Sequence, residues 1–326
     1  MASKIRWGIL STAKIGEKRV IPAMQASRNG EVAAVASRSL DKAKEFASRT
    51  GIPTAYGHYE ELIAAPDIDA IYISVPNSEH ARWSLLCAEA GKPTLCEKPL
   101  ASDAAEAQAI VDAFASRNLL FAEAFMYRFH PQHQRVLDLI AAGEIGAIRL
   151  MSAAFSFAIS REDDIRLQGS LAGGALMDVG CYCINALRLI TGEEPMRGEA
   201  LARFGGGDVD EVIAGVLEFP SGVVGHIDAS LRAHYTNTYE VRGSEGRIVV
   251  EKAFVPHGQE TLIRHWRGDQ YSEYTLPPAE QYQLMAEDFA DALLTGRAPR
   301  FPAQDAVENM RAIDRLLASA RRHKNS

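Results

Sequence analysis

The 326-residue sequence has few cysteines and no excess of basic charge. Its four cysteines, Cys87, Cys96, Cys181 and Cys183, contain no CxxC pair. Neither a disulfide framework nor a zinc site is therefore indicated, and we predict no metal. Cys181 and Cys183 would diverge on a helix, because residues two apart do not share a face. The net charge of −7 at pH 7 argues against nucleic acid as a partner, since phosphate binding needs a concentrated basic face.

The sequence also lacks the signs of a targeting or membrane-spanning segment. Its start, Met-Ala-Ser-Lys-Ile-Arg-Trp, does not have the basic-then-apolar order of a signal peptide. We see no apolar run of the roughly eighteen residues that a membrane span needs. We therefore expect a cytoplasmic, reduced protein with no membrane partner.

The first part of the chain alternates strand-like and helix-like segments. Apolar strands are expected at 5–10, 31–37, 70–75, 94–96 and 119–122, and helices at 15–27, 40–50, 79–90 and 104–117. Such alternation, with nearly continuous apolar strands, predicts a parallel sheet covered by helices on both faces. We assign residues 1–123 to a Rossmann-type nucleotide-binding domain.

The pattern changes after residue 123. Helices are expected at 131–142, 174–191, 281–295 and 305–320, and paired strands at 212–219 with 223–231 and at 239–242 with 248–251. Turn residues between the paired strands indicate antiparallel hairpins. Residues 124–326 are predicted to form an α+β substrate-binding and oligomerisation domain with a large, mostly antiparallel open sheet, and the fold class as a whole is α/β.

The turn after the first strand departs from the usual dinucleotide-binding pattern. It reads Ser11-Thr12-Ala13-Lys14-Ile15-Gly16, where G-x-G-x-x-G is typical. Ser11 and Ala13 are small, so backbone N–H groups could still approach a pyrophosphate at the helix start. By itself the turn does not distinguish a nucleotide site from an ordinary strand-to-helix turn.

The residues at the end of the second strand bear on whether the chain prefers NAD or NADP. An NAD site usually has an acid here for the ribose 2′-hydroxyl, but this strand ends in Ser37-Arg38 with no carboxylate. Arg38 could pair with a 2′-phosphate, and Lys42 could add a second positive charge. This pattern favours NADP; the alternative is that both are ordinary solvated charges at a helix start.

Two further strands end in polar residues at the carboxyl edge of the sheet, where ligands bind. Ser74-Val75-Pro76-Asn77 and His80 follow one strand, and Glu97-Lys98-Pro99 follows the next. Asn77 is either a helix cap or a ribose contact. A partly buried Lys98 would have a lowered pKa suited to proton transfer; the alternative is a surface lysine in a turn.

Three polar residues of the second half share one helix face. Asp178, Tyr182 and Asn185 lie at i, i+4 and i+7. The preceding Gly173-Gly174 would let the helix start press against a ligand. The stripe is either a proton-transfer site or a buried hydrogen-bond network.

Taken together, these segments resemble the Gfo/Idh/MocA oxidoreductase family over essentially the whole chain. The segments that carry the resemblance are 7–13, 36–38, 97–100, 123–131, 173–182 and 243–246. The resemblance implies an N-terminal domain that binds NAD(P) and a C-terminal open sheet that commonly forms the oligomer contact. A homodimer or homotetramer is therefore expected.

The resemblance also implies residue roles. Lys98 would be the active-site lysine, followed by a peptide bond to Pro99 that is often cis in relatives, and Asp178 would match the family's aspartate. Many members have histidine four residues later, whereas this chain has Tyr182, as do the dihydrodiol dehydrogenases and some aldose-oxidising members. That residue favours a phenolic acid/base. Arg166 and Tyr282 sit where relatives make further cofactor or substrate contacts.

The function expected is NADP-dependent hydride transfer to or from a carbinol or carbonyl carbon of a sugar, polyol or vicinal diol. Lys98 and Tyr182 would form the acid/base pair, with Asp178 as an orienting group and the loop 155–168 setting specificity. Three alternatives stay open: an aldose–aldose (glucose–fructose type) oxidoreductase that holds NADP tightly, a 2-oxo-acid or imine reductase, and a non-catalytic NADP-sensing regulator.

Overall fold

The computed structural model describes residues 4–256 and 258–324, so the first three residues of the chain start discussed above lie outside the described part. The described residues form two compact units. The first consists of the chain up to Phe129 together with Glu280–Val307, and the second of His130–Ala279 together with the chain from Glu308. The chain therefore passes between the units after Phe129, after Ala279 and after Val307.

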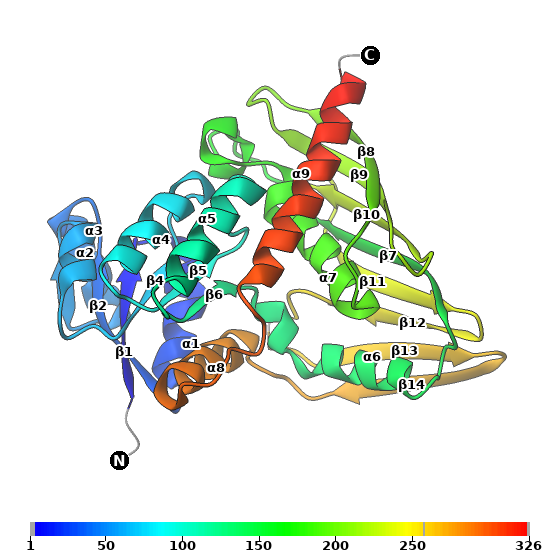
Figure 1. Ribbon diagram of the computed structural model, residues 1–326, viewed down its shortest axis with the longest axis horizontal. Coiled ribbons are helices and arrows are strands. Elements are labelled where there is room, and N and C mark those ends of the chain that lie inside the picture. The colour runs from blue at the N-terminus through cyan, green and yellow to red at the C-terminus, as the bar shows by residue number, and fades with distance from the viewer. Residues whose placement is uncertain (1–3, 257, 325–326) are drawn as a thin grey trace. The chain divides into compact units, whose positions relative to one another are not determined.

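The first unit is built on a six-stranded parallel sheet with the strand order β3-β2-β1-β4-β5-β6 (Figure 1). Its strands are β1 (Ile5–Leu10), β2 (Gly30–Ala36), β3 (Thr54–Tyr56), β4 (Ala70–Ile73), β5 (Thr94–Glu97) and β6 (Phe121–Ala124). Every residue of β4 and β5 is buried, as expected for central strands covered on both faces. This confirms the predicted Rossmann-type sheet.

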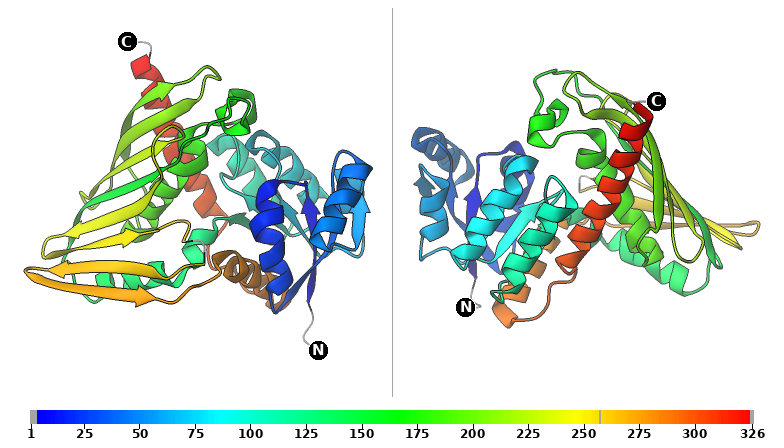
Figure 2. Two further views of the ribbon diagram at one scale, coloured as in Figure 1. Left: turned by 180° about the vertical axis from the view of Figure 1, so that it is seen from behind. Right: turned by 45° about the horizontal axis from the view of Figure 1, so that its top comes forward.

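Helices cover both faces of this sheet. They are α1 (Ile21–Ala26) after the π-helical turn η1 (Gly16–Val20), α2 (Leu40–Thr50), α3 (Tyr59–Ala64), α4 (His80–Glu89) after η2 (Asn77–Glu79), α5 (Ala104–Ala115) and the short turn η3 (Met126–Phe129). Figure 1 shows α4 and α5 in front of the sheet, and Figure 2 shows α1 on the opposite side. Helix α2 is capped by Ser39, whose side chain accepts a hydrogen bond from the backbone N–H of Lys42.

Helix α8 (Gln281–Thr295) has the predicted bounds but belongs to the first unit, whereas the sequence assigned it to the second domain. The ring of Phe289 packs 5.1 Å from that of Trp7 in β1. Asn29 Nδ2 donates to the carbonyl oxygen of Glu287 at 2.9 Å. The apolar face of α8 indicates that the helix packs against another element. The sequence pattern does not say which element, so it could not assign α8 to the first unit.

The second unit is built on an eight-stranded sheet with the strand order β14-β13-β12-β11-β7-β10-β9-β8. Its strands are β7 (Ile148–Ser156), β8 (Arg197–Phe204), β9 (Asp210–Glu218), β10 (Val224–Ser230), β11 (Thr236–Gly243), β12 (Gly246–Glu251), β13 (Thr261–Arg267) and β14 (Gln270–Leu276). Neighbouring strands are antiparallel except β7 and β10, which are parallel. The predicted hairpins β9–β10 and β11–β12 are confirmed, as is the mostly antiparallel open sheet.

Helices of the second unit lie on one face of this sheet (Figure 2). They are α6 (Pro131–Ala141), α7 (Cys181–Thr191) and the part of α9 (Gln304–Lys324) that follows Val307, with the short turns η4 (Ile165–Leu167), η5 (Gly169–Leu171) and η6 (Leu176–Gly180) before α7. Helix α7 packs against β7 and β10. The opposite face exposes the apolar side chains of Leu201, Val212, Val216 and Val224.

Among residues 4–256 and 258–324, one segment is apolar enough to cross a membrane by length and composition, although the sequence analysis expects none. It is Gly169–Thr191, and 72% of its most apolar window is buried inside the protein. All residues from Cys181 to Arg188 are buried. The segment is therefore accounted for as the core helix of the second unit.

Candidate active site

The carboxyl ends of β1, β2 and β4 bring Ser11, Ser37 and Ser74 to one edge of the parallel sheet. The Ser11 hydroxyl donates to the carbonyl oxygen of Ser74 at 2.9 Å, and the two side-chain oxygens are 3.0 Å apart. Ser11 has φ of 108°, a conformation that glycine adopts more easily than other residues. The turn thus keeps a glycine-like backbone at the first position of the fingerprint, and hydrogen bonds of the serine hydroxyl hold it there.

The rest of this turn leaves small side chains beside the start of η1. Thr12, Ala13 and Ile15 are partly exposed, and Lys14 is exposed. The backbone N–H of Ala13 donates to Ser11 Oγ at 3.3 Å, which fixes the path of the turn. A phosphate could approach the backbone here without meeting a bulky side chain at Ala13, as the sequence predicts.

The end of β2 presents two cations to solvent. Arg38 and Lys42 are both exposed, and neither forms an ion pair within the described part of the chain. By contrast, Arg49, on the helix that bears Lys42, is bonded to Glu17 at 3.0 Å and to Glu45 at 2.7 Å. Two cations without internal carboxylates, at the carboxyl edge of a parallel sheet, are suited to an anionic ligand.

The turn after β4 is tied to the turn after β5 by a buried histidine. His80 is fully buried; its Nδ1 lies 2.9 Å from the carbonyl oxygen of Pro99 and its Nε2 lies 3.0 Å from that of Val75. Burial lowers the pKa of His80 to about 4, and the positive charge of Lys98 acts in the same direction. We predicted a cofactor contact for His80, but both ring nitrogens face backbone carbonyls. The ring supports the Lys98-Pro99 turn, whose peptide bond is cis.

Lys98 follows a buried acid at the end of β5. The Glu97 carboxylate accepts a hydrogen bond of 2.7 Å from the Tyr72 hydroxyl. Burial, and after it the negative charge of Glu97, raises the pKa of the Tyr282 phenol in α8. Lys98 itself is partly buried. Lys98 and the Tyr72–Glu97 pair therefore lie at the same sheet edge as the serine turn.

In the second unit, Asp178 is held by an arginine. It lies in η6, where its Oδ2 accepts a hydrogen bond of 2.8 Å from Nε of Arg166. Nη1 of Arg166 also lies 3.2 Å from Oδ1 of Asp164. The charge of Asp178 is the main cause of the raised pKa of Arg166. Arg166 is thus bound between two carboxylates, and sequence reasoning did not identify Asp164 because it had no motif to mark it.

Tyr182 lies one turn further on, in an aromatic environment. It is 5% exposed. Its ring centroid is 5.4 Å from that of Phe155 in β7 and 5.6 Å from that of Phe254. These rings limit the access of water to the phenol. The tyrosine is therefore held in place on α7 by apolar contacts.

The third member of the predicted polar stripe belongs to a buried network. Asn185 Nδ2 lies 3.5 Å from Oδ1 of Asn309 in α9, and Asn309 Nδ2 donates to the carbonyl oxygen of Cys181 at 3.3 Å. Both asparagines are buried. Asn185 therefore belongs to a buried hydrogen-bond network, which was one of the two interpretations of the polar stripe. Asp178 and Tyr182 have other partners.

The two glycines before the helix fit against protein atoms. A Cβ on Gly174 would lie 2.3 Å from a carboxylate oxygen of Asp210, and one on Gly173 would lie 2.4 Å from the carbonyl oxygen of Arg166. Oδ2 of Asp210 accepts a hydrogen bond of 2.7 Å from the backbone N–H of Leu176. These contacts correct the expectation that Gly173-Gly174 presses against a ligand. Sequence reasoning missed Asp210, for which the glycine pair is the only signal.

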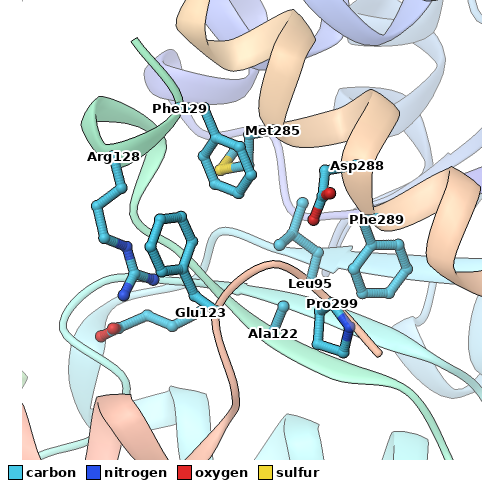
Figure 3. Close-up of a pocket in the computed structure, with 10 residues that line it drawn as sticks. Leu95, Ala122, Glu123, Arg128, Phe129, Met285, Asp288, Phe289 and Pro299 are labelled. Atoms are coloured by element: carbon cyan, nitrogen blue, oxygen red, sulfur yellow. The ribbon is translucent and has the colours of Figure 1, made fainter. Parts of the chain in front are cut away.

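Two further features of the described residues bear on where a ligand binds. Among residues 4–256 and 258–324, no group of three or more His, Cys, Asp or Glu side chains could hold a metal ion. A small cavity of the first unit has room for about one water molecule, at about 10 Å³. Figure 3 shows it between apolar side chains such as Leu95 and Phe289, with Glu123 and Arg128 on one side and Asp288 on another. It is too small for a sugar.

The predicted site residues therefore form two groups. Ser11, Ser37, Ser74, Glu97 and Lys98 lie at one edge of the sheet in the first unit. Arg166, Asp178 and Tyr182 lie in η4, η6 and α7 of the second unit. The approach of Lys98 to Tyr182 stays a prediction.

Comparison with known proteins identifies the family. The oxidoreductase family with an NAD-binding Rossmann fold matches residues 5–125, and the GFO/IDH/MocA C-terminal domain matches residues 133–249. The chain is 41% identical over 317 residues to D-xylose 1-dehydrogenase (NADP(+)) 2 of Haloferax volcanii, covering 96% of this chain and 97% of the relative. It is 34% identical to trans-1,2-dihydrobenzene-1,2-diol dehydrogenase of Bos taurus, covering 84% of this chain and 81% of the relative.

A solved structure agrees over the whole fold. A 3-ketoreductase from Actinomadura kijaniata, crystallised with NADP and TDP-benzene, superimposes with a TM-score of 0.93 at 34% identity, covering 97% of this chain and 98% of that one. The same reductase has been solved with a lysine replaced and with a tyrosine replaced. These two residues are as far apart in its sequence as Lys98 and Tyr182 are here. The chain belongs to the Gfo/Idh/MocA family and is an NAD(P)-dependent oxidoreductase acting on CH–OH groups.

Proposed function

We propose that the protein is an NADP(H)-dependent oxidoreductase that transfers a hydride to or from a carbinol or carbonyl carbon of a sugar, polyol or vicinal diol. The observation that carries the proposal is the carboxyl edge of the parallel sheet. There Arg38, the serine-bonded turn at Ser11 and the partly buried Lys98 follow the carboxyl ends of β2, β1 and β5 of the same sheet. Ligands of open parallel sheets bind at this edge.

The residues of this edge fit NADP. Arg38 and Lys42 would bind the 2′-phosphate, and the absence of a carboxylate at the end of β2 removes the usual acceptor for a 2′-hydroxyl. The turn Ser11–Ile15 would hold the pyrophosphate, and Asn77 the ribose. When bound, the nicotinamide ring supplies or accepts the hydride at its C4 atom. The names of the xylose dehydrogenase and of the reductase complex, which both include NADP, support this assignment.

The protein's own side chains would handle the proton. During reduction, the Tyr182 hydroxyl donates its proton to the nascent alkoxide; during oxidation, the same oxygen takes the proton of the substrate hydroxyl. The positive charge of Lys98 stabilises the alkoxide, and Asp178, fixed by Arg166, orients a neighbouring hydroxyl. General acid catalysis of this kind is typically worth about 10²–10⁴-fold in rate. The matching separation of the lysine and tyrosine replaced in the reductase supports this pair.

The test is a substrate panel followed by absorbance at 340 nm. Aldoses, polyols, vicinal diols and dicarbonyls are offered with NADP⁺, NADPH, NAD⁺ and NADH. Lys98→Met and Tyr182→Phe are each expected to lower kcat about 10²–10⁴-fold while NADPH still binds, as measured by its fluorescence. The matched controls Lys44→Met and Tyr271→Phe change exposed side chains and are expected to keep full activity.

Several results would change the assignment. Full turnover by Tyr182→Phe would remove the acid role. Binding of NADPH without turnover of any compound would favour the regulator. A freshly purified protein that already absorbs at 340 nm would favour the aldose–aldose type with a tightly held cofactor. A homodimer or homotetramer formed through the open sheet, and a cytoplasmic location, stay predictions.

A further inference from the structure

Tyr235 is an exposed aromatic side chain that the second unit holds in a fixed position. It directly precedes β11 and is 47% exposed. Nδ2 of Asn237 donates a hydrogen bond of 3.0 Å to its hydroxyl oxygen. Asn237 itself is only 6% exposed. A buried asparagine thus orients a phenol of which about half the surface faces solvent.

The other hydrogen bonds of Asn237 settle the direction of this bond. Oδ1 of Asn237 accepts from the backbone N–H of Phe254 at 2.7 Å, and its Nδ2 also donates to the carbonyl oxygen of Val255 at 3.3 Å. The amide nitrogen therefore faces the phenol, whose oxygen is the acceptor. A phenol also carries one O–H donor, and within residues 4–256 and 258–324 that of Tyr235 has no acceptor. The donor is available to a ligand.

The ring of Tyr235 belongs to the same aromatic cluster as Tyr182. Its centroid is 6.4 Å from that of Phe155, and the two rings are nearly perpendicular. Phe155 in turn packs against Tyr182, with 5.4 Å between the centroids. Phe254, to whose backbone Asn237 is bonded, also packs against Tyr182, at 5.6 Å. Two separate connections therefore join Tyr235 to the surroundings of the predicted acid/base.

Tyr235 lies on the face of the eight-stranded sheet that α7 covers. The buried Asn237 of β11 is paired with Phe155 of β7, which is also buried, and α7 packs against β7. Side chains two positions apart in an extended segment share a face. Tyr235, two positions before Asn237, accordingly contacts Phe155. Its ring is thus on the face that carries Tyr182, not on the helix-free face.

An exposed phenol of this kind suits a sugar or a diol. Such molecules combine C–H groups, which pack against an aromatic ring, with hydroxyl oxygens, which accept hydrogen bonds. The ring of Tyr235 offers the first contact and its O–H the second. Because Phe155 and Asn237 already hold the side chain, binding immobilises little additional rotamer freedom, which favours affinity.

We propose that Tyr235 is a specificity-determining residue that contacts the substrate. Its ring packs against substrate C–H groups, and its hydroxyl donates a hydrogen bond to a substrate hydroxyl other than the one on the reacting carbon. Asn237 fixes the phenol oxygen so that the O–H points away from the protein. This inference rests on the proposed function and adds a substrate contact to it.

The first experiment measures kcat and KM of two variants with the best substrate of the panel, at saturating NADP⁺ or NADPH. Tyr235→Phe is expected to raise KM about fivefold, because one hydrogen bond is lost. Tyr235→Ala is expected to raise it about 50-fold, because the apolar contact is lost as well. For both, kcat is expected to stay within about twofold, since contacts of equal strength in the ground and transition states change KM alone.

The matched controls are Tyr271→Phe and Tyr271→Ala. Tyr271 in β14 is exposed to a similar degree, at 50%, packs against another aromatic ring, that of Trp266, and is bonded to the side chain of Glu273. It has no contact with the aromatic cluster around Tyr182 among the described residues. Both control variants are expected to keep the wild-type kcat and KM.

The second experiment separates a direct contact from an effect on protein shape. KM is measured for the wild type and Tyr235→Phe with deoxy analogues of the substrate, each lacking one hydroxyl. In the wild type, removal of the bonded hydroxyl is expected to raise KM about fivefold. In Tyr235→Phe the same removal adds nothing, because the pair is already broken. A change of shape would instead raise KM by a similar factor for every analogue.

Three outcomes would overturn the inference. An unchanged KM for Tyr235→Ala would refute the contact while the proposed oxidoreductase function stands. Equal effects of Tyr235→Phe on all the deoxy analogues would show that the phenol bonds no substrate hydroxyl. Turnover of no compound by the wild-type protein would refute the proposed function, and the inference would fall with it.

Discussion

At the scale of the residue, His80 shows how a side chain can act on the site without touching a ligand. A neutral imidazole carries one N–H, yet both ring nitrogens face carbonyl oxygens, those of Pro99 and Val75. With its pKa lowered to about 4, the ring is neutral at pH 7 and donates to one of them. It nevertheless fills the space between the two turns and keeps the Lys98-Pro99 turn in place.

Replacing this ring should affect turnover more than cofactor affinity. We expect His80→Ala to lower kcat about tenfold or more, because displacement of a catalytic group by about 1 Å can cost up to about 100-fold. The Kd for NADPH, measured by fluorescence, is expected to change less. His58→Ala, at an exposed histidine, is the control. A lower Tm with unchanged kcat would mean that His80 only stabilises the fold.

Arg38 makes the preference for NADP testable at a single position. Hydrogen bonds to charged groups contribute about 1.5–3 kcal/mol, so Arg38→Ala should raise KM for NADP⁺ by about 10–100-fold. KM for NAD⁺ should change little, because that dinucleotide lacks the 2′-phosphate. Arg49→Ala, on the helix α2 that follows Arg38 but paired with Glu17 and Glu45, is the control. An equal rise of both KM values would contradict the assignment.

At the scale of the element, the start of the helix that bears Asp178 and Tyr182 depends on Asp210. This carboxyl is 2% exposed, and burial raises its pKa from 3.8 to about 7. At a pH between 3.8 and about 7, the Asp210 carboxyl is ionised in the unfolded chain but stays protonated in the folded protein. The contribution of Asp210 to stability is therefore full below about pH 4 and is lost as the pH rises through 7.

Asp210→Asn should remove this dependence, since asparagine still accepts from the Leu176 N–H but does not ionise. We expect the Tm of the variant, relative to the wild type, to rise as the pH is raised from 4 to 8. Differential scanning fluorimetry across this range is the measurement. Parallel Tm curves for the two proteins would show that Asp210 does not titrate as described.

Local patterns in the sequence predicted where helices and strands lie better than they predicted which elements pack or pair with each other. The bounds of α2 and α8 and the hairpin β9–β10 followed from periodicity and turn residues, which act over short distances. The parallel pairing of β7 with β10 and the packing of α8 on β1 join distant segments, and no local pattern encodes such contacts. The same limit applies to the site. Departures from a motif led to the predictions for Ser11 and Arg38, which stay predictions, whereas the contacts of His80 and Asp210 become visible only in the fold.

At the scale of the whole molecule, the helix-free face of the eight-stranded sheet suits association of identical chains. Leu201, Val212, Val216 and Val224 expose apolar side chains on β8, β9 and β10, and contiguous apolar patches often mark interfaces. We expect Val216→Glu to shift the protein to a smaller species in light scattering. Leu284→Glu, at an exposed leucine of α8 in the first unit, should not. An unchanged mass for Val216→Glu would exclude this face as the contact.

The return of the chain to its first unit affects how the protein is made. Trp7 and Asn29 find Phe289 and Glu287 only after α8 has left the ribosome, although nascent domains generally fold from the N-terminus as they emerge. The nucleotide-binding half therefore waits, with part of its apolar surface uncovered, through most of translation. A chaperone that shields β1 and α1 during that interval would raise the yield of active protein, and a ribosome-stalled chain ending at Phe129 would remain sensitive to protease.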